Sequence, residues 1–353
     1  MITKIIQEEK IQKAKKYVEK GESFVIVTHV SPDGDALGSS LGLYHFLSAY
    51  GKDNVAVVVP NAFPSFYRWM PGAKDVVIHE KYPDFAEKLI KEADVIFCLD
   101  FNDLKRIDRT APMVEESRAP RVVVDHHLNP LIEADVLISH PEVSSTCALL
   151  FQLCEALGID SALTPDAAMC CCTGMMTDTG NFSYNSNDPQ LYRILARLVA
   201  TGIDKDAIYT RLFNTNSEQR VRIMGYGQSS KLQILREHQA ALITLSYEEL
   251  QRFGYHRGDT EALVNVPLSI PGITYSIFLR EDEPDYVKVS MRSKGDFSVK
   301  QICEDHFGGG GHRNAAGGEM RCPFTVAIEK VLAVMPGYDG MLPPPDDDAC
   351  PSK

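Results

Sequence analysis

The sequence lacks the features of a membrane or secreted protein. No uninterrupted apolar run approaches the roughly 20 residues that a membrane-spanning helix needs. Residues 1–21 carry lysine and glutamate throughout, as an amphipathic helix does, and have neither the apolar centre nor the cleavage site of a signal peptide. We therefore expect a cytoplasmic protein with no membrane partner.

The nine cysteines have none of the spacings of a zinc site. Three of them are adjacent, Cys170-Cys171-Cys172, within an apolar stretch that is expected to be helical. The simplest interpretation is that they are small buried hydrophobic residues in a reducing compartment. A redox or metal-binding role is the alternative.

Basic residues are in deficit, with 36 lysines and arginines against 48 aspartates and glutamates and a net charge of −12. This balance argues against tight binding of long duplex nucleic acid through its phosphates. Small anionic substrates stay possible, because bound divalent metals reverse the charge locally. The 353 residues, 44% hydrophobic and 24% charged, are typical of a globular protein with room for two domains.

Short apolar runs separated by helix-length segments fill the first half of the chain. Such runs predict a parallel sheet with helices on both faces, in which ligands bind beyond the carboxyl ends of the strands. The expected strands are Ser23–Val30, Asn54–Val59, Ala93–Asp100, Arg121–Asp125 and Asp135–Ser139.

The pattern then becomes helical, with expected helix starts near Ser145, Thr164, Asp188 and Ser217 and helical structure to about Arg236. Strands return at 240–245, 275–279 and 286–292, the last two joined by a turn at 280–285, before a last helix at 325–334. This order predicts a smaller mixed α/β domain. The expected division is a catalytic domain at 1–200, a helical linker at 201–236, a second domain at 237–340 and a disordered tail at 341–353.

Histidines and aspartates gather where the expected strands end. His29, Asp33 and Asp35 follow the first strand, Asp100 ends the third, and the fourth ends in Asp125-His126-His127. Asp178 lies near the end of an apolar helix, where the helix dipole disfavours a negative charge unless a cation compensates it. The alternative for one of these residues, Asp33 or Asp35, is that it only caps a helix. Together these side chains are sufficient for two metal ions that share a carboxylate.

The order of these motifs, HxxxDxD, Asp100, Asp125-His126-His127 and Asp178-Thr179-Gly180, resembles that of the DHH phosphoesterases. The resemblance implies that His29 and Asp33 bind one metal, that Asp35, His126 and Asp178 bind another, and that Asp100 bridges them. It further implies catalytic roles for Asp100, for His127, which would face the substrate phosphate, and for Asp125, which would orient a ligand imidazole. Two divalent ions, manganese or magnesium, are expected. One departure is that residues 181–184 contain no basic residue, which many members of the family have after this last motif.

A second motif is the run of glycines at 308–311, followed by His312 and Arg313. Glycine lets a backbone approach an anion closely, so we expect a phosphate site at the start of a short helix; a flexible linker is the alternative. Alternation over 287–292 places Lys288, Ser290 and Arg292 on one face of a strand. The DHH-associated domain that this region resembles implies a set of substrate-binding residues, namely Ser290, Arg292, Gly309, Gly310, Gly311, His312 and Arg313.

The compact two-domain organisation, with an active site expected in the cleft between the domains, favours one branch of the family. That branch comprises oligoribonucleases acting on dinucleotides and very short RNA (nanoRNA), often with pAp phosphatase activity. The alternatives are a phosphodiesterase for cyclic or linear dinucleotides, an exopolyphosphatase and a nucleotide-binding regulator without catalysis. The expected partner is short RNA or a nucleotide phosphate, and the sequence leaves open a homodimer.

Overall fold

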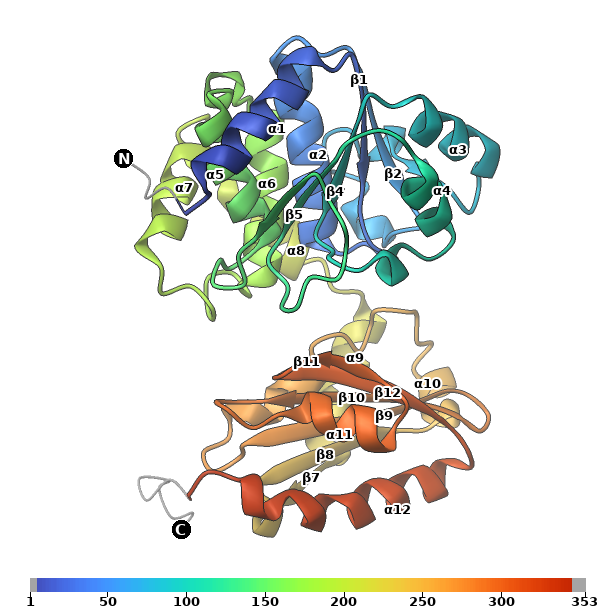
Figure 1. Cartoon of the computed structure of the whole chain (residues 1–353). Coiled ribbons are helices and arrows are strands. Elements are labelled where there is room, and N and C mark those ends of the chain that lie inside the picture. The colour runs from blue at the N-terminus through green and yellow to red at the C-terminus, as the bar shows by residue number, and fades with distance from the viewer. Residues whose placement is uncertain (1–4, 345–353) are drawn as a thin grey trace. The chain divides into compact units, whose positions relative to one another are not determined.

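The computed structural model describes residues 5–344 and divides the chain into two units, Met1–Thr215 and Asn216–Lys353 (Figure 1). The segment predicted as a linker, 201–236, contains one helix on each side of this division. These helices are α8(Lys205–Phe213) and α9(Glu218–Ser230). Over the described residues, no helix combines the length and the apolar character needed to cross a lipid bilayer.

A six-stranded sheet forms the centre of the first unit, in the order β3-β2-β1-β4-β5-β6. Every neighbouring pair is parallel, so the carboxyl ends of all the strands share one edge. This confirms the predicted parallel sheet, to which the structure adds the short edge strand β3. The strands are β1(Ser23–Val27), β2(Asn54–Val59), β3(Val77–Ile78), β4(Val95–Leu99), β5(Arg121–Asp125) and β6(Val136–Ser139).

Helices cover both faces of this sheet (Figure 1). The larger hydrophobic core lies between one face and α1, α2, α5, α6, α7 and α8, and a smaller core lies between the other face and α3 and α4. Besides α8, the helices of the unit are α1(Glu8–Lys20), α2(Gly34–Ala49), α3(Pro83–Glu92), α4(Ala111–Glu116), α5(Thr146–Leu157), α6(Pro165–Asp178) and α7(Pro189–Val199). The predicted starts are confirmed, because Ser145, Thr164, Asp188 and Ser217 each accept a backbone N–H of the helix that follows.

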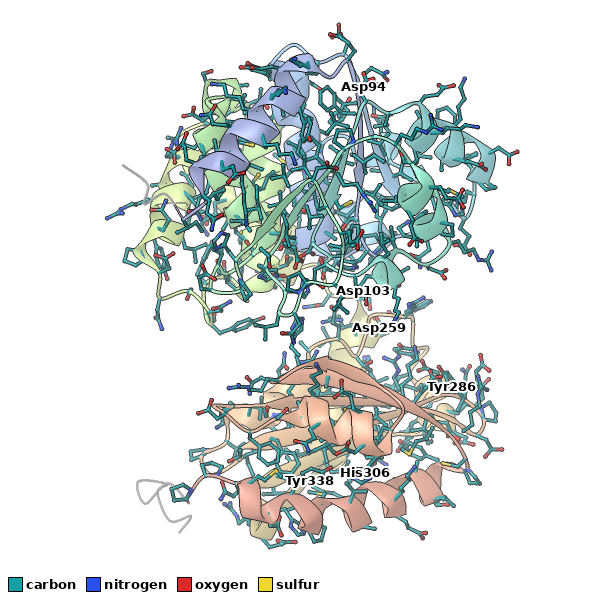
Figure 2. All side chains as sticks on the ribbon, viewed as in Figure 1. Asp94, Asp103, Asp259, Tyr286, His306 and Tyr338 are labelled. Atoms are coloured by element: carbon teal, nitrogen blue, oxygen red, sulfur yellow. The ribbon has the colours of Figure 1, made fainter. Side chains whose placement is uncertain are left out.

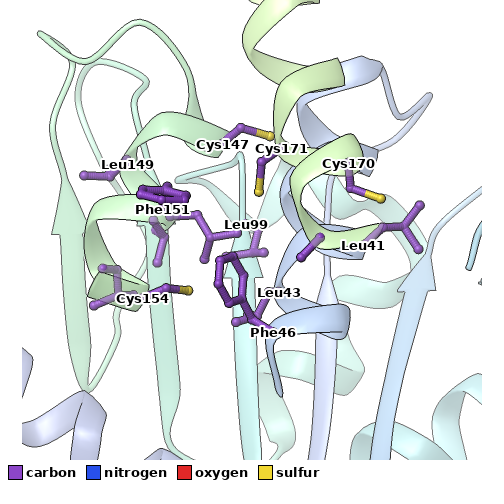
Figure 3. Close-up of a cluster of buried hydrophobic side chains, with 14 of the residues drawn as sticks. Leu41, Leu43, Phe46, Leu99, Cys147, Leu149, Phe151, Cys154, Cys170 and Cys171 are labelled. Atoms are coloured by element: carbon purple, nitrogen blue, oxygen red, sulfur yellow. The ribbon is translucent and has the colours of Figure 1, made fainter. Parts of the chain in front are cut away.

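Helices α2 and α6 pack closely enough to exclude side chains larger than glycine. A Cβ atom on Gly34 would lie 2.4 Å from Thr177 Oγ1, and one on Gly38 would lie 2.6 Å from the carbonyl oxygen of Cys170. Residues 170–172 are fully buried and their thiols are free, as expected of small hydrophobic residues, and Cys170 and Cys171 contact the glycines of α2. Figure 3 shows Cys170 and Cys171 on α6 near Leu41, together with Cys147 of α5. The close packing brings the start of α2 next to the end of α6.

The second unit contains a mixed sheet in the order β11-β12-β10-β9-β8-β7, in which only β8 and β9 are parallel among the described strand pairs. One face packs against α11 and α12, and the part formed by β8 and β9 packs on its other face against α9 and a 3-10 segment, η6(Leu263–Ser269). The strands are β7(Leu232–Leu235), β8(Ala240–Leu245), β9(Tyr275–Glu283), β10(Tyr286–Ser293), β11(Gly310–His312) and β12(Ala315–Arg321). The helices are α9, α10(Tyr247–Arg252), α11(Val299–His306) and α12(Phe324–Val334).

Three predictions for this unit need correction. Residues 232–235 form a strand where helix was expected, and β9 continues to Glu283, which shortens the turn predicted at 280–285. The glycine run does not start a helix but follows α11 and enters the β11–β12 hairpin. A Cβ atom on Gly309 would lie 1.8 Å from the carbonyl oxygen of Gly317, so the hairpin itself requires glycine there. The sequence pattern does not reveal this contact because Gly317 belongs to a different strand.

Packing also accounts for the end of the described chain. His306 Nε2 lies 2.9 Å from the hydroxyl of Tyr338, and both residues are labelled in Figure 2. Leu342 packs against the core of the second unit, and the carbonyl of Pro343 accepts a hydrogen bond from the side chain of Gln239. Most of the predicted disordered tail, residues 345–353, lies outside the described part of the chain.

Candidate metal centre

The predicted ligands come from the carboxyl edge of the first sheet and from the two helix ends beside it. His29 lies two residues beyond β1, Asp100 follows β4 and His126 follows β5. Asp33 and Asp35 are at the start of α2, and Asp178 is the last residue of α6. Because β1, β4 and β5 are parallel neighbours and α2 packs on α6, residues distant in sequence meet at one place.

The structure brings all six predicted ligands together. One group, whose ligand atoms lie within 4.8 Å of one another, contains His29, Asp33 and Asp100, a second contains Asp35, His126 and Asp178, and a third contains Asp100, His126 and His127. Asp100 lies between the first two, with its Oδ2 3.3 Å from His29 Nε2 and its Oδ1 3.7 Å from His126 Nε2. This is the arrangement expected of a carboxylate shared by two cations.

The start of α5 supports two buried carboxylates, Asp35 and Asp100. The backbone N–H groups of Thr146 and Cys147 donate to Asp35 at 2.6 and 2.9 Å, and the Thr146 hydroxyl donates to Asp100 at 2.9 Å. These donors direct the carboxylates and compensate for part of their burial. Sequence reasoning left Thr146 without a role; its position at the start of a helix that follows a strand of the parallel sheet was the only available signal.

Asp100 has an unusual backbone conformation. It is a non-glycine residue with φ of +64°, and its backbone N–H donates to Val124 on the neighbouring strand. Left-handed residues of this kind are strained and occur preferentially at functional sites, where the surrounding structure holds them. The strain therefore marks Asp100 as a residue whose position matters more than its local stability.

Backbone carbonyls orient two of the histidines of the ligand groups. His29 Nδ1 lies 2.8 Å from the carbonyl oxygen of Val30, and His126 Nδ1 lies 3.1 Å from that of Val143. A proton on each Nδ1 leaves Nε2 with its lone pair facing the carboxylates, which is the tautomer that a metal ligand requires.

Asp125 contacts a different histidine from the one expected. Its Oδ1 lies 2.6 Å from His127 Nδ1, and its Oδ2 accepts the backbone N–H of His127 at 2.9 Å. The expectation that Asp125 orients a ligand imidazole therefore needs correction: it orients His127, while the carbonyl of Val143 orients His126. Asn102, which sequence reasoning missed, holds the carbonyls of His127 and Leu128 with its side-chain amide.

Negative charge dominates the site, with Asp33, Asp35, Asp100, Asp125 and Asp178 against three imidazoles. Burial makes a proton on two of these carboxylates more favourable than it is in water. Burial raises the pKa of Asp178 to about 6, and burial with the charges of Asp178 and Asp100 raises the pKa of Asp35 well above its usual value. Bound cations would remove the need for these protons.

The imidazoles respond in the opposite sense. Burial lowers the pKa of His29, but the hydrogen bond and charge of Asp100 outweigh it and raise this pKa to about 9. Burial likewise opposes a charge on His126, whose contacts with Asp178, Asp100 and Asp35 raise its pKa to about 11. The carboxylates around both imidazoles therefore favour a positive charge at this place, which a divalent cation would also supply.

The predicted substrate residues of the second unit lie on one part of its sheet. The expected alternation of β10 is confirmed, because Val287, Val289 and Met291 are buried while Ser290 and Arg292 are half-buried. Arg292 of β10 lies opposite Ala315 of β12, and Ala315 lies opposite His312 of β11. Likewise, Ser290 of β10 lies opposite Gly317 of β12, and Gly317 lies opposite Gly310 of β11. Arg313 is exposed and forms an ion pair with Asp296 at 2.8 Å.

Comparison with known families accounts for both units. The model of the DHH family, N-terminal domain, matches residues 23–203, and that of the DHHA1 domain matches residues 241–335. The chain belongs to the DHH family. Among curated members of the family, it is 33% identical to the bifunctional oligoribonuclease and PAP phosphatase NrnA of Thermus thermophilus, over 87% of each chain. It is 27% identical to the NrnA of Bacillus subtilis, over 85% of this chain and 90% of that one.

Solved structures show the same DHH-family fold. An exopolyphosphatase-related protein from Bacteroides fragilis is 47% identical and matches with a TM-score of 0.93, over 96% of this chain and 99% of that chain. RecJ from Thermus thermophilus in complex with Mn²⁺ is 13% identical and matches with a TM-score of 0.53 over 97% of this chain and 56% of that one, which shows a similar fold alone.

Proposed function

We propose that this DHH-family protein is a metal-dependent phosphoesterase that hydrolyses dinucleotides and very short RNA, and that also removes a phosphate from pAp. The observation that carries the proposal is the set of three candidate ligand groups, which Asp100 and His126 link to one another. The identity to two proteins named bifunctional oligoribonuclease and PAP phosphatase supports this substrate class.

The donor set suits two divalent ions, manganese first and magnesium as the alternative, because it consists of imidazoles and carboxylates without thiolates. His29 and Asp33 would hold one ion, Asp35, His126 and Asp178 the other, and Asp100 both. Once bound, such a pair activates a water molecule and neutralises the charge that develops on the phosphoryl group.

His127 has a separate role in this proposal. Its Nδ1 is held by Asp125, so we assign the contact with the substrate to its Nε2. From there it would donate a hydrogen bond to the phosphate and a proton to the leaving oxygen, in the way a histidine oriented by a buried carboxylate acts as a general acid. The predicted catalytic roles of Asp125 and His127 are thereby kept, with their pairing corrected.

The second unit would bind the substrate phosphate that is not cleaved. Arg292 and His312 supply cationic or N–H donors in one row of the sheet, and Ala315 between them carries too small a side chain to fill the space. Ser290, Gly309, Gly310 and Gly311 would add hydroxyl and backbone contacts, with Arg313 at the margin.

The test is hydrolysis of a panel of compounds with Mn²⁺ or Mg²⁺: labelled pApA, pAp, a linear and a cyclic dinucleotide, and polyphosphate. We expect release of mononucleotides from pApA and of AMP from pAp, both lost in Asp178→Asn. Asp103→Asn is the matched control, because Asp103 caps a turn through Lys105 and lies outside all of the ligand groups. Asp103 is labelled in Figure 2. Nucleotide binding without turnover under either metal would favour the regulator instead.

Exopolyphosphatase activity is the second candidate, favoured by the 47% identity to the exopolyphosphatase-related protein. It predicts that polyphosphate is cleaved with a higher kcat/KM than pApA. The same panel therefore decides between the two.

A further inference from the structure

The loop that follows Asp178 is tightly folded around Thr179. The backbone N–H groups of Ser183 and Tyr184 both donate to the Thr179 carbonyl, at 2.8 and 3.1 Å, and that of Phe182 donates to the Thr179 hydroxyl at 2.9 Å. Residues 180–182 all have positive φ, between +53° and +63°, although two of them are not glycine. Such strain persists only where the surrounding structure holds it.

This fold places the Tyr184 ring directly over Gly180, two residues beyond Asp178. A Cβ atom on Gly180 would lie 2.2 Å from Cε1 of the ring, and the Tyr184 side chain is nevertheless 55% exposed. The ring therefore has one face against the backbone beside a candidate metal ligand and much of its remaining surface open to solvent.

A second apolar side chain lies beside His126. Leu128 is 62% exposed, yet its loop is held by Asn102, whose side chain bonds to the carbonyls of residues 127 and 128. The carbonyl of Asn102 also accepts the N–H groups of Leu131 and Ile132, at 2.8 and 2.9 Å. Leu128 is thus exposed on an anchored segment.

His126 and Asp178 connect the two loops, because His126 Nε2 lies 3.2 Å from Asp178 Oδ2. Leu128 lies two residues beyond His126, and the Tyr184 ring lies over Gly180, which is two residues beyond Asp178; both Leu128 and Tyr184 are exposed. Residues 181–184 themselves carry no positive charge. Apolar surface next to a site for phosphate suits the flat, apolar face of a nucleobase.

We propose that Tyr184 and Leu128 bind a base of the substrate and so determine specificity for nucleotides over bare phosphate chains. Tyr184 stacks on the base and Leu128 covers part of the same nucleoside. This inference rests on the proposed phosphoesterase function and deepens it, because the candidate metal ligands by themselves would accept any phosphate ester.

The test compares pApA with an analogue of the same sugar-phosphate skeleton in which hydrogen replaces both bases. For Tyr184→Ala we expect KM for pApA to rise about tenfold, the loss of one base stacked on one ring. Leu128→Ala should raise it about fivefold, through lost apolar contact. KM for the abasic analogue and kcat for pApA should each stay within about twofold, the range of a neutral surface substitution.

Two controls separate stacking from a general loss of structure. Tyr184→Phe keeps the ring and should restore KM for pApA to within about twofold of the unaltered protein. Tyr50→Ala removes an exposed tyrosine just after the other end of the 16-residue helix α2, about 22 Å along the helix from Asp35, and should leave KM unchanged for both substrates.

The outcomes are distinct. Equal effects of Tyr184→Ala on both substrates would mean that the ring positions the metal centre, and no effect on either would mean that the base lies elsewhere; each overturns the inference while the phosphoesterase function stands. Absence of turnover of both compounds by the unaltered protein would instead count against the proposed function, and the inference would fall with it.

Discussion

The two units hold their functional side chains in opposite ways. In the first unit, Asp35 and Asp125 are completely buried, and each carboxylate is fixed by two or more N–H donors within its own unit. In the second unit, Arg292 is half-buried and His312 is exposed, on strands with small residues between them. Buried charge requires fixed compensation, so the first arrangement suits ions of defined geometry, whereas the second suits a larger ligand that adapts.

Asp100→Asn should have the largest effect, because it removes the carboxylate that lies between His29 and His126 and belongs to two of the candidate ligand groups. We expect the loss of activity to exceed the 10–100-fold, roughly, that removal of an outer partner of a metal ligand costs, with metal bound more weakly at both groups. Titration calorimetry with Mn²⁺ would measure the stoichiometry and affinity. Two ions retained with unchanged affinity would contradict the role of Asp100 as a bridge.

Asp125→Asn should lower kcat by roughly 10–100-fold while leaving the number of bound metal ions unchanged. The reason is that Asp125 orients His127 and belongs to neither of the two groups that share Asp100. Measuring Mn²⁺ affinity and kcat on the same preparation separates the two possible partners of Asp125. A fall in affinity as large as the fall in kcat would favour the original expectation that it supports His126.

Arg292→Ala should raise KM by about tenfold, the contribution of a charge-assisted hydrogen bond to a phosphate, with little change in metal affinity. Arg313→Ala is its counterpart on the same hairpin region, and we expect a smaller rise, because Arg313 lies in the turn between β11 and β12, outside the row of Arg292, Ala315 and His312, and forms an ion pair with Asp296 at 2.8 Å. Steady-state kinetics with pApA compares them. Equal effects would mean that the pair with Asp296 opens when substrate binds.

The sequence predicted most of the first unit because its signals are local. Apolar β-branched runs mark the strands, and Ser145, Thr164 and Asp188 mark helix starts through contacts within a few residues. The six candidate ligands could be proposed because parallel strands carry their carboxyl ends to one edge. The known order of motifs in the family then divided them into two groups.

What the sequence could not predict depends on contacts between distant residues or on loop conformation. Thr146 reaches Asp100 across 46 positions, with no pattern linking them. His126 and His127 are adjacent, and which ring meets Asp125 depends on the backbone just beyond β5. The glycine run was assigned to a helix start because its closest contact, Gly317, lies in a strand that the pattern did not reveal.

Replacing either of two adjacent glycines, Gly309 or Gly310, should have the smallest effect. The two substitutions distinguish a glycine that the fold requires from one that substrate binding requires. Gly309→Ala should lower the free energy of unfolding of the second unit by about 1–3 kcal/mol, since its Cβ would overlap the backbone of Gly317. Gly310→Ala should change it by less than about 0.5 kcal/mol, because its nearest atoms belong to the flexible Glu304 side chain, at 3.6 and 3.8 Å. Hydrogen exchange of peptides covering 307–321 measures both. If Gly310→Ala leaves exchange unchanged but raises KM for pApA, substrate binding requires the absence of a side chain at 310. If KM is also unchanged, Gly310 is not a substrate contact, and the hairpin explains the glycine run.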